Sequence, residues 1–479
     1  MNNLQTRFPQ IQQEIVVILM AFLSLSALNA CSLTLPPPTP TMIPTRIPTL
    51  VPTLIPSVTF SGPRTIFVDN RLGSDSNPGT QARPLHTIQM AANVTHAGDT
   101  VIVLAGTYNE RVYLANSGTS GASITYQAQG QVVMQGFTIK ANYISIKGFE
   151  ITNTPDDDQE GFGIFVQGDS CDIENNYVYF ATRGGIQLNA ASDHCTVRNN
   201  RLYRDSQFGI GVDGLDQLVV GNEIWDSIQF HPKWLNPPGW VDADGIRFFG
   251  SGHVLRGNYI HDISYKDPLN VNPHIDCFQT FSDANHKAAS NITIEQNRCD
   301  NDELAKSIGQ GGTGFTMEGG SKIMIRNNVV NAFVDVFLQN CDGISILNNT
   351  LIGNTRQDPA YYPVGISLNQ TSGIVIQNNI LYDQPENVIY VKGSQPISGK
   401  NMVYRDDGRP ISTTDSYSSV NDLWGINPMF VAPATNDYHL QSGSPAIDAG
   451  LNLGSLVPDD FDGVSRPQTA GYDIGAYEY

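Results

Sequence analysis

The segments DIENNYV (residues 172–178) and TVRNNRL (residues 196–202) decide the fold of this 479-residue chain. In each of them an apolar residue stands between polar ones, a pair of asparagines follows, and another apolar residue comes next. The sequence holds nine such cassettes; the first, at Ile144, lacks asparagine, and the later ones keep it at Asn222, Asn258, Asn297, Asn328, Asn349 and Asn379. Self-similarity at a short period indicates a chain built from stacked copies of one unit.

A second short apolar segment precedes the asparagine cassette from the second copy onward, as at Gly185-Ile186 and Gly209-Ile210. Two short alternating strands per period, joined by a turn, are typical of a parallel β-helix. Asparagine tolerates the left-handed backbone conformation that such turns need. Stacked asparagine amides can hydrogen-bond along the axis, so we interpret the repeated asparagine as structural. The sequence therefore predicts an all-β solenoid, a parallel β-helix, over residues 61–430.

The spacing of the turn asparagines shows which coils carry insertions. It is 24 residues from Asn176 to Asn200 and 22 to the next, then 36, 39 and 31, and finally 21 and 30. A bare coil takes 21 to 24 residues, and three consecutive coils carry extra loops at 226–244, 261–276 and 300–313. All three loops enter the same strand of the coil, so we expect them to form one wall beside it. Loops on a rigid scaffold are where binding and catalysis concentrate.

Both ends of the solenoid lack the cassette. Residues 84–95 have apolar residues at helical spacing, which predicts an N-terminal helix that caps the open end of the coil stack. Residues 431–479 are predicted to form a cap that closes the other end. Cys171 and Cys195 hold the same cassette position in neighbouring coils, and the sequence leaves open whether they form a disulfide or pack as two thiols.

Residues 1–30 have the character of a lipoprotein export signal and are left out of the fold. Their apolar stretch is shorter than the roughly 20 residues that a transmembrane helix needs. The sequence LNAC at residues 28–31 resembles a lipobox, which predicts lipidation of Cys31. Prolines recur every four residues within residues 31–60, so this segment is predicted to be an extended tether. We expect an exported protein at the cell envelope or outside the cell, attached to a membrane through Cys31 alone.

The charge balance narrows the choice of partners. Asp and Glu number 46 against 27 Lys and Arg, which gives a formal net charge of −19. Nucleic acid and anionic membrane surfaces both require a basic area, so the composition excludes them as direct partners. An acidic glycan would be repelled unless a divalent cation or a local basic patch intervenes.

Strand alternation predicts an outward column of side chains on the coils that carry the loops. Stacked strands lie about 4.8 Å apart, close to the rise of one sugar in an extended chain. Amides can recognise sugar hydroxyls and aromatic rings can stack on sugar faces, so the column suits a polysaccharide; the alternative is a merely solvated outer face. The predicted substrate-binding residues are Gln187, Asp213, Phe249, Gln279, Phe281 and Glu318.

Asp244 and Asp276 precede equivalent strands on adjacent coils, and Asp242 is near Asp244. Carboxylates so close repel each other unless a cation bridges them, and calcium takes about six to eight oxygen ligands. Calcium bound by Asp242, Asp244 and Asp276 is therefore one hypothesis. The others are that each aspartate caps a turn, or that two of them act as general acid and base.

The predicted catalytic residues are Arg247, His274 and Asp276. In an extended segment His274 and Asp276 lie on the same side, so Asp276 could orient the imidazole as a base. Arg247 could act as a base, clamp a carboxylate of the substrate, or form a structural ion pair.

Several segments of the chain resemble secreted bacterial parallel β-helix proteins, among them FVD at 67–69, NPGT at 77–80 and GSPAIDAG at 443–450. Together with the coils, they resemble the pectate-lyase-like right-handed parallel β-helix superfamily over nearly everything after residue 64. The resemblance implies that the solenoid is right-handed. It does not choose a chemistry, because this fold hosts lyases, hydrolases, epimerases and adhesins.

Part of the chain also resembles family-nine polysaccharide lyases. Their first sequence element is matched by ADG around Asp244, their second in part by DCF beginning at Asp276, and their third by GFT ending at Thr316. The resemblance implies that Asp244 and Asp276 bind calcium. Gln279 and Ile275 replace acidic residues of the second element, and Thr316 stands where the lyases have their catalytic lysine.

The leading functional hypothesis is a calcium-assisted polysaccharide lyase that acts on a uronate-containing glycan. One alternative is a glycoside hydrolase that uses paired carboxylates, and another is a non-catalytic glycan-binding lipoprotein of the cell surface. The carboxylates available to a hydrolase are Asp213, Asp244, Asp276 and Glu318. We expect a monomer with a polysaccharide as its partner.

Overall fold

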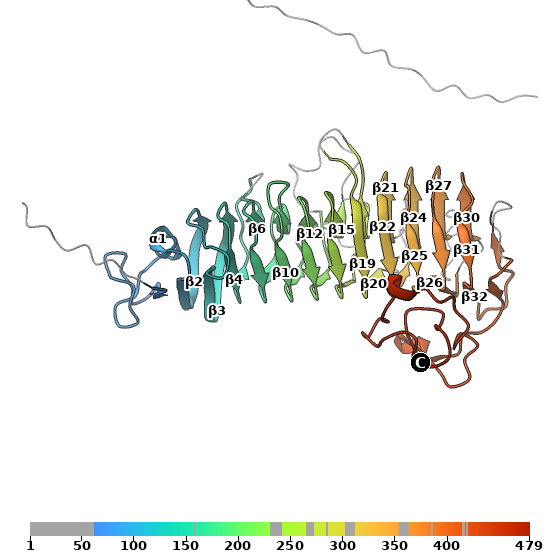
Figure 1. Ribbon diagram of the computed structural model, residues 1–479. Helices are drawn as coiled ribbons and strands as arrows, with labels where there is room; N and C mark the ends of the chain where they lie inside the picture. Colours follow the sequence, from blue (N-terminus) through green and yellow to red (C-terminus); the bar gives the residue numbers. More distant parts are fainter. Residues whose placement is uncertain are drawn as a thin grey trace, which may run out of the picture. The chain divides into compact units, whose positions relative to one another are not determined.

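The computed structural model describes residues 62–157, 160–229, 242–264, 273–283, 286–301, 312–353, 364–384, 387–413, 417 and 420–479. Within the unit formed by residues 60–479, parallel strands follow one another along a single axis (Figure 1). The predicted signal, Cys31 and the tether lie outside the described residues, as do residues 230–241, 265–272 and 302–311 of the predicted insertions. Where the chain is described, no helix is long and apolar enough to cross a membrane.

Each coil consists of three short strands, so the solenoid has three parallel sheets and the prediction of two strands per coil is wrong. Sheet 1 is formed by β4 (Ile144–Lys147), β7 (Asp172–Glu174), β10 (Thr196–Arg198), β13 (Leu218–Val220), β16 (Val254–Arg256), β19 (Ser290–Glu295), β22 (Ser321–Arg326), β25 (Ser345–Leu347), β28 (Val375–Gln377) and β31 (Ile397–Gly399). Sheet 2 is formed by β5 (Glu150–Ile151), β8 (Tyr177–Tyr179), β11 (Arg201–Tyr203), β14 (Glu223–Trp225), β17 (Tyr259–His261), β20 (Arg298–Asn301), β23 (Val329–Ala332), β26 (Thr350–Gly353), β29 (Ile380–Tyr382), β32 (Met402–Tyr404) and β34 (Leu423–Trp424). Sheet 3 is formed by β6 (Phe162–Val166), β9 (Gly184–Leu188), β12 (Gln207–Val212), β15 (Ala243–Phe248), β18 (Asp276–Thr280), β21 (Thr313–Glu318), β24 (Val334–Gln339), β27 (Val364–Asn369), β30 (Asn387–Lys392) and β33 (Ser412–Thr413).

The asparagine pair separates sheet 1 from sheet 2. Its first member adopts a left-handed conformation, with φ of 56° at Asn175, and this bend makes the next apolar residue begin a strand of its own. Its second member is buried, and the Asn176 side-chain amide donates to Asn200 Oδ1 over 3.0 Å. The same bond recurs from coil to coil as far as Asn401, whose amide donates to the Asp422 carboxylate. The structural interpretation of the repeated asparagine is confirmed.

The core fills the inside of the solenoid as one continuous apolar cluster. Cys171 and Cys195 are buried in it as free thiols, and the backbone N–H of Cys171 donates to Cys195 Sγ over 3.4 Å. Of the two alternatives for this pair, packed thiols are the one observed. A disulfide joins Cys277 and Cys299 instead.

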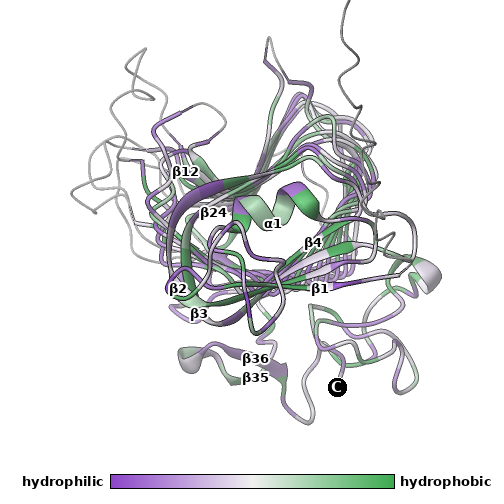
Figure 2. Cartoon of the chain, turned by 90° about the vertical axis from the view of Figure 1, so that its left-hand side faces the viewer, coloured by the Kyte–Doolittle hydropathy of each residue, from purple (hydrophilic) through white to green (hydrophobic). Residues whose placement is uncertain are grey.

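The first strands of the stack are β1 (Thr65–Val68), β2 (Thr100–Leu114) and β3 (Ile124–Ile139), and β3 pairs with β4, β5 and β6. The helix α1 (Ile88–Val94) begins after Thr87, whose hydroxyl accepts the Met90 N–H, and it buries Ile88, Ala91 and Ala92. Seen along the axis, α1 lies in front of the ring of strands at this end (Figure 2). Its role as a cap stays a prediction.

The tail, residues 431–479, which was predicted to close the far end, lies along sheet 2 (Figure 1), and its role as a cap stays a prediction. Its antiparallel strands β35 (Phe430–Ala432) and β36 (Asp437–Leu440) flank the 3-10 helix η2 (Pro433–Thr435), and η3 (Gly454–Leu456) follows. Turn asparagines hold the tail: the amide of Asn327 donates to the Asp459 carbonyl over 2.8 Å, and that of Asn348 to the Asp473 carbonyl over 2.8 Å. Outward apolar side chains of sheet 2 also pack against it, namely Val329, Ile352, Ile380 and Met402.

Candidate functional site

The register of sheet 3 sets the predicted outward residues in one column. Arg247 of β15 pairs with Gln279 of β18, Gln279 pairs with Thr316 of β21, and Thr316 pairs with Phe337 of β24. Between them the side chains of Ile246, Phe278 and Phe315 are fully buried in the core. The alternation expected from sequence is therefore confirmed for these coils.

A cleft of about 640 Å³ lies over this column. Five of the predicted site residues line it, namely Asp242, His274, Gln279, Phe281 and Glu318. Ser282, Asp283, Thr316 and Phe337 complete the described lining. Three carboxylates, an imidazole, an amide, two hydroxyls and two phenyl rings thus line one cleft. The sequence-based hypothesis assigns sugar binding to such a mixture of amides and aromatic rings.

His274 and Asp276 form a dyad at the start of β18. His274 Nδ1 lies 2.6 Å from Asp276 Oδ2, with the imidazole one quarter exposed and the carboxylate fully buried. The second carboxylate oxygen accepts the Thr316 hydroxyl over 2.6 Å, and Gln279 Nε2 donates to Oδ2 over 3.1 Å. The negative charge of Asp276 raises the pKa of His274 to about 10. The predicted pairing of the two residues is confirmed, and it holds the ring as a proton donor at neutral pH.

Arg247 is held by two aspartates. Its Nη2 donates to Asp242 Oδ2 over 2.8 Å and to Asp244 Oδ2 over 2.6 Å, and only 12 % of its side chain is exposed. Its guanidinium also lies over the Phe208 ring at 5.0 Å and over the Phe281 ring at 5.8 Å. Of the three roles that the sequence left open for Arg247, these contacts favour the structural ion pair.

The two aspartates that precede equivalent strands are neighbours, as predicted. Asp244 Oδ1 accepts the backbone N–H of Asp276 over 3.3 Å, so Asp244 caps the beginning of the next strand. Asp244 is fully buried, and burial raises its pKa well above the usual range against the opposing charge of Arg247.

The predicted calcium ligands do not form one open oxygen cluster. Asp242, Asp244 and His274 bring one ligand atom each within 4.8 Å of one another, but an imidazole nitrogen is a poor calcium ligand. Arg247 is bonded to both aspartates, and the oxygens of Asp276 are bonded to His274, Gln279 and Thr316. The described residues therefore do not fit calcium.

Three predicted binding residues, Gln187, Asp213 and Phe249, lie outside the described lining of the cleft. Gln187 Nε2 donates to Asp213 Oδ2 over 3.0 Å, and burial raises the pKa of Asp213. Phe249 is also misjudged from sequence as exposed. Only 5 % of it is exposed, because its ring packs edge-on against Phe281 and is stacked on His286 at 4.4 Å.

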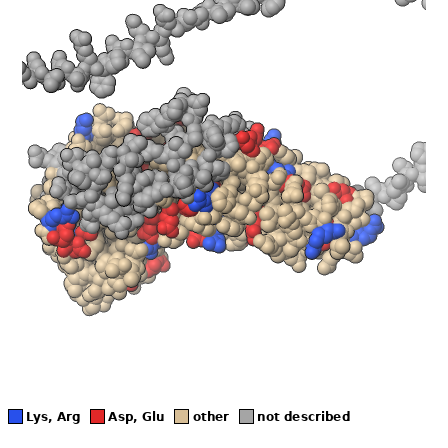
Figure 3. Space-filling model, turned by 180° about the vertical axis from the view of Figure 1, so that it is seen from behind, with Lys and Arg blue, Asp and Glu red and all other residues tan. Residues whose placement is uncertain are grey.

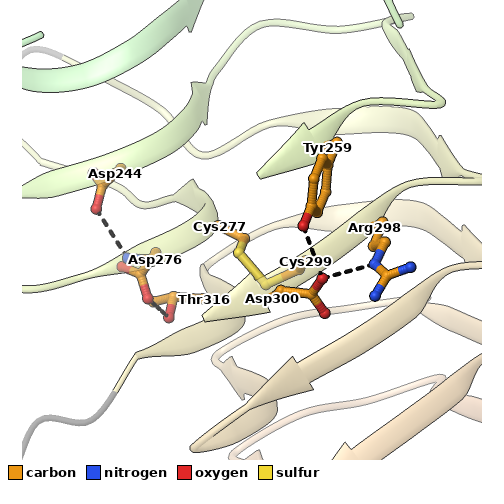
Figure 4. Close-up of a disulfide and its surroundings, with 8 residues drawn as sticks. All are labelled: Asp244, Tyr259, Asp276, Cys277, Arg298, Cys299, Asp300 and Thr316. Carbon is orange, nitrogen blue, oxygen red and sulfur yellow. Dashed lines mark hydrogen bonds and ion pairs between the residues drawn. A yellow bond between two sulfur atoms is a disulfide. The ribbon is translucent and has the colours of Figure 1, made fainter. Parts of the chain in front are cut away.

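The disulfide behind the dyad was missed from sequence. Cys277 follows Asp276 directly, and its bond to Cys299 ties β18 to β20 behind the carboxylates (Figure 4). The corresponding corner residue on the preceding coil is Gly245, from which a side chain would point at core residue Ile260. Cys299 pairs with Ile260 in register. The sequence signal for this disulfide was available, because Cys277 and Cys299 stand at two positions of the coil that face each other.

Charged side chains elsewhere on the body occur in mixed clusters. Figure 3 shows acidic and basic groups side by side on the face seen there, between stretches of uncharged surface. Arg198 on sheet 1, for example, pairs with both Asp172 and Glu174. The negative net charge thus includes carboxylates that are already paired.

Comparison with known proteins agrees with this geometry. Residues 66–217 match a family model described as Pel9A-like, right handed beta helix region, and residues 244–421 match one described as right handed beta helix region. A pectate disaccharide-lyase of Dickeya chrysanthemi is 24% identical over 340 residues, which are 68% of this chain and 38% of that enzyme. The chain thus spans about two fifths of the length of that relative.

Solved structures of the same architecture extend the comparison. Pectate lyase Pel9A superimposes with a TM-score of 0.52 at 19% identity, covering 87% of this chain and 97% of that one. XylC in complex with xylose superimposes with a TM-score of 0.55 at 13% identity, covering 86% and 98%. The fold and these matches define a right-handed parallel β-helix protein. Among such proteins the chain is similar to a pectate disaccharide-lyase in sequence and to pectate lyase Pel9A in fold.

Proposed function

We propose that the protein is a polysaccharide lyase that cleaves a uronate-containing glycan in the cleft over β18, β21 and β24. The observation that carries the proposal is the His274–Asp276 dyad, which is held at 2.6 Å and whose imidazole lines that cleft. The relationship to a pectate disaccharide-lyase supports the same reaction class. Polysaccharide is then the partner, and no calcium-dependent step is included.

In β-elimination a base removes the proton next to the uronate carboxylate. The electron pair left on that carbon forms a double bond, the bond to the glycosidic oxygen breaks, and the departing oxygen takes up a proton. We assign to His274 the protonation of the departing oxygen, because its raised pKa keeps the ring protonated at neutral pH, and Asp276 keeps the ring in position. We assign no base among the described residues. Thr316 stands where related lyases have a lysine, and its hydroxyl donates to Asp276 instead. The lysines of the predicted insertions, Lys233, Lys266 and Lys306, lie outside the described residues.

The rest of the cleft is assigned to substrate binding. Phe281 and Phe337 offer apolar faces for sugar rings, and Gln279 offers an amide for hydroxyls. Glu318 and Asp283 line the same cleft and make a glycoside hydrolase the second candidate, since paired carboxylates are what that reaction needs.

The test incubates the protein with polygalacturonate, alginate, rhamnogalacturonan and a neutral glycan, and follows both unsaturated products and new reducing ends. A lyase forms both from a uronate polymer. Reducing ends without unsaturation would replace the proposal by the hydrolase, and glycan binding without cleavage would leave a binding protein. His274→Ala should lower kcat/KM at least about tenfold, or roughly 1.4 kcal/mol, whereas Asn369→Ala, three coils further along sheet 3, should not.

We also propose that Cys31 carries a lipid that attaches the protein to a membrane at the cell envelope. The LNAC sequence at residues 28–31 and the proline-rich segment after it support this. Wild-type protein should partition into detergent, and Cys31→Ser should be released or remain unprocessed. A Cys31→Ser protein that is cleaved normally and stays on the membrane would refute the anchor.

A further inference from the structure

The cluster beside the dyad concentrates negative charge on one side of the cleft. Asp242, Asp244 and His274 place one ligand atom each within 4.8 Å of one another. Asp242 and His274 pair in parallel just before β15 and β18, and Asp244 is the second residue of β15. Asp244 is fully buried, and one quarter of the Asp242 side chain is exposed. Two carboxylates in such a place repel each other and need a counter-charge.

Arg247 supplies that counter-charge from within the chain. Nη2 bridges Oδ2 of Asp242 and Oδ2 of Asp244 at 2.8 and 2.6 Å, and Nε reaches Asp244 Oδ2 at 3.2 Å. One group therefore contacts the two oxygens between which a bridging cation would lie. A guanidinium carries one charge and directional donors, so it can hold two carboxylates without a metal's full ligand shell.

The aromatic contacts fix Arg247 in this position. Phe208, from the preceding coil, lies 5.0 Å from the guanidinium carbon, and Phe281, beyond the following strand, lies 5.8 Å from it. A side chain confined by two rings and two carboxylates, and 12 % exposed, is not available to follow a substrate's carboxylate.

We propose that Arg247 takes the place of a divalent cation between Asp242 and Asp244, so that the cleft keeps its shape without a bound metal. Arg247 is then a positioning residue that holds Asp244, and Asp244 in turn accepts the backbone N–H of Asp276. This inference concerns the architecture of the cleft and does not depend on the reaction proposed above.

The first test is thermal unfolding of the full-length wild-type protein in excess EDTA and in millimolar calcium or manganese chloride. The melting temperature should be the same in all three, because no cation site is open. A melting temperature that falls in EDTA and recovers with either metal would overturn the proposal.

The second test uses Arg247→Ala, which frees both carboxylates. It should melt below wild type in EDTA and gain at least about 2 °C on addition of calcium or manganese. The double variant Arg247→Ala/Asp244→Asn should lose that gain, and Arg247→Lys, which keeps a positive charge, should not respond to metal.

If the melting temperature of Arg247→Ala changes with neither metal, Arg247 does not take the place of a cation and the proposal is refuted. If Arg247→Ala does not fold, the Arg247→Lys and wild-type comparisons decide, since a metal response in either contradicts the proposal. No glycan enters these tests, so their outcome is separate from that of the lyase assay.

Discussion

At the scale of single residues, Arg247 of β15 contacts Asp242, which precedes that strand, and two rings from other coils. Alternation places Arg247 and Gln279 on the outer face correctly, because the side-chain period of a strand is fixed by its backbone. What Arg247 contacts depends on Asp242, five residues before it and outside the strand, and on rings from two other coils. Phe249 was misjudged for the same reason, since the ring that covers it belongs to His286. The dyad was predictable because its two members are only two residues apart in an extended segment.

The effect of the Asp205 carboxyl on the free energy of unfolding can be measured by varying the pH. It is fully buried at the start of β12, its Oδ1 accepts the Ala181 N–H over 2.8 Å, and its Oδ2 has no hydrogen-bond partner. Burial raises the pKa of Asp205 well above its usual range. A carboxyl with a raised pKa keeps its proton in the folded state. The stability that this carboxyl contributes to the fold is therefore complete below its pKa in the unfolded chain, about 3.9. That stability is lost as the pH rises through the pKa of Asp205 in the folded protein.

Asp205→Asn keeps the acceptor for Ala181 and has no proton to lose. We expect it to match wild type near pH 4 and to exceed it in unfolding free energy by about 1–2 kcal/mol near pH 8. Denaturant unfolding at several pH values measures the difference. Asp216→Asn, at a carboxyl that is 58 % exposed, should show no such trend; a pH-independent gap at Asp205 would contradict the explanation.

At the scale of elements, the asparagine cassette carried enough information to give the solenoid but not the number of strands. The count of two strands per coil is wrong because the residues on both sides of the left-handed Asn175 form strands, β7 and β8, and the second apolar segment adds a third, β9. The cassette predicted the ladder itself because a buried amide needs a partner, and the copy of itself one coil away supplies one.

Asn258 lies in the middle of this ladder. Its Oδ1 accepts the backbone N–H of Asn222 at 3.0 Å and the side-chain amide of Asn222 at 2.9 Å, in a fully buried place. Asn258→Ala leaves these donors unpaired, so we expect a loss of about 3 kcal/mol in unfolding free energy. Denaturant unfolding tests it against Asn175→Gly, a change at an exposed turn asparagine whose φ of 56° suits glycine. Equal losses in the two variants would mean that the ladder contributes no more than the turn.

The disulfide is the second element whose contribution can be isolated. Cys277 and Cys299 are 22 residues apart, and closing a loop of that length stabilises a fold by about 3 kcal/mol in the chain-entropy model. Cys277→Ala/Cys299→Ala should lose about that amount, and a reductant should lower the melting temperature of wild type but not of the double variant. Cys171→Ala, at a buried free thiol, should keep the response to reductant. A wild-type protein indifferent to reductant would show that the bond does not stabilise the fold.

At the scale of the whole molecule, the tail could not be placed from sequence because it has no repeat to set its register. The tail packs against the outward-facing apolar side chains of sheet 2 on the C-terminal coils. Its own fold is fixed by Arg466, whose Nη1 lies 2.6 Å from Glu478 Oε2, with at most 1 % of either side chain exposed. Arg466 also donates to the Gly475 carbonyl over 2.8 Å.

Glu478→Ala should detach the tail while the coils remain folded. Removing one partner of a buried ion pair costs about 3–5 kcal/mol, because the other charge is left without compensation. In a solenoid each coil depends only on its neighbours, so this loss should stay local. We expect protease cleavage within residues 431–479 of the variant at enzyme levels that leave wild type intact, with sheet 3 and the cleft unaffected. Glu223→Ala, which breaks the exposed pair with Arg201, should resist protease as wild type does. Cleavage that spreads through the coils of Glu478→Ala would show that the tail supports the whole solenoid, because the outward apolar rows of sheet 2 could not then remain folded without it.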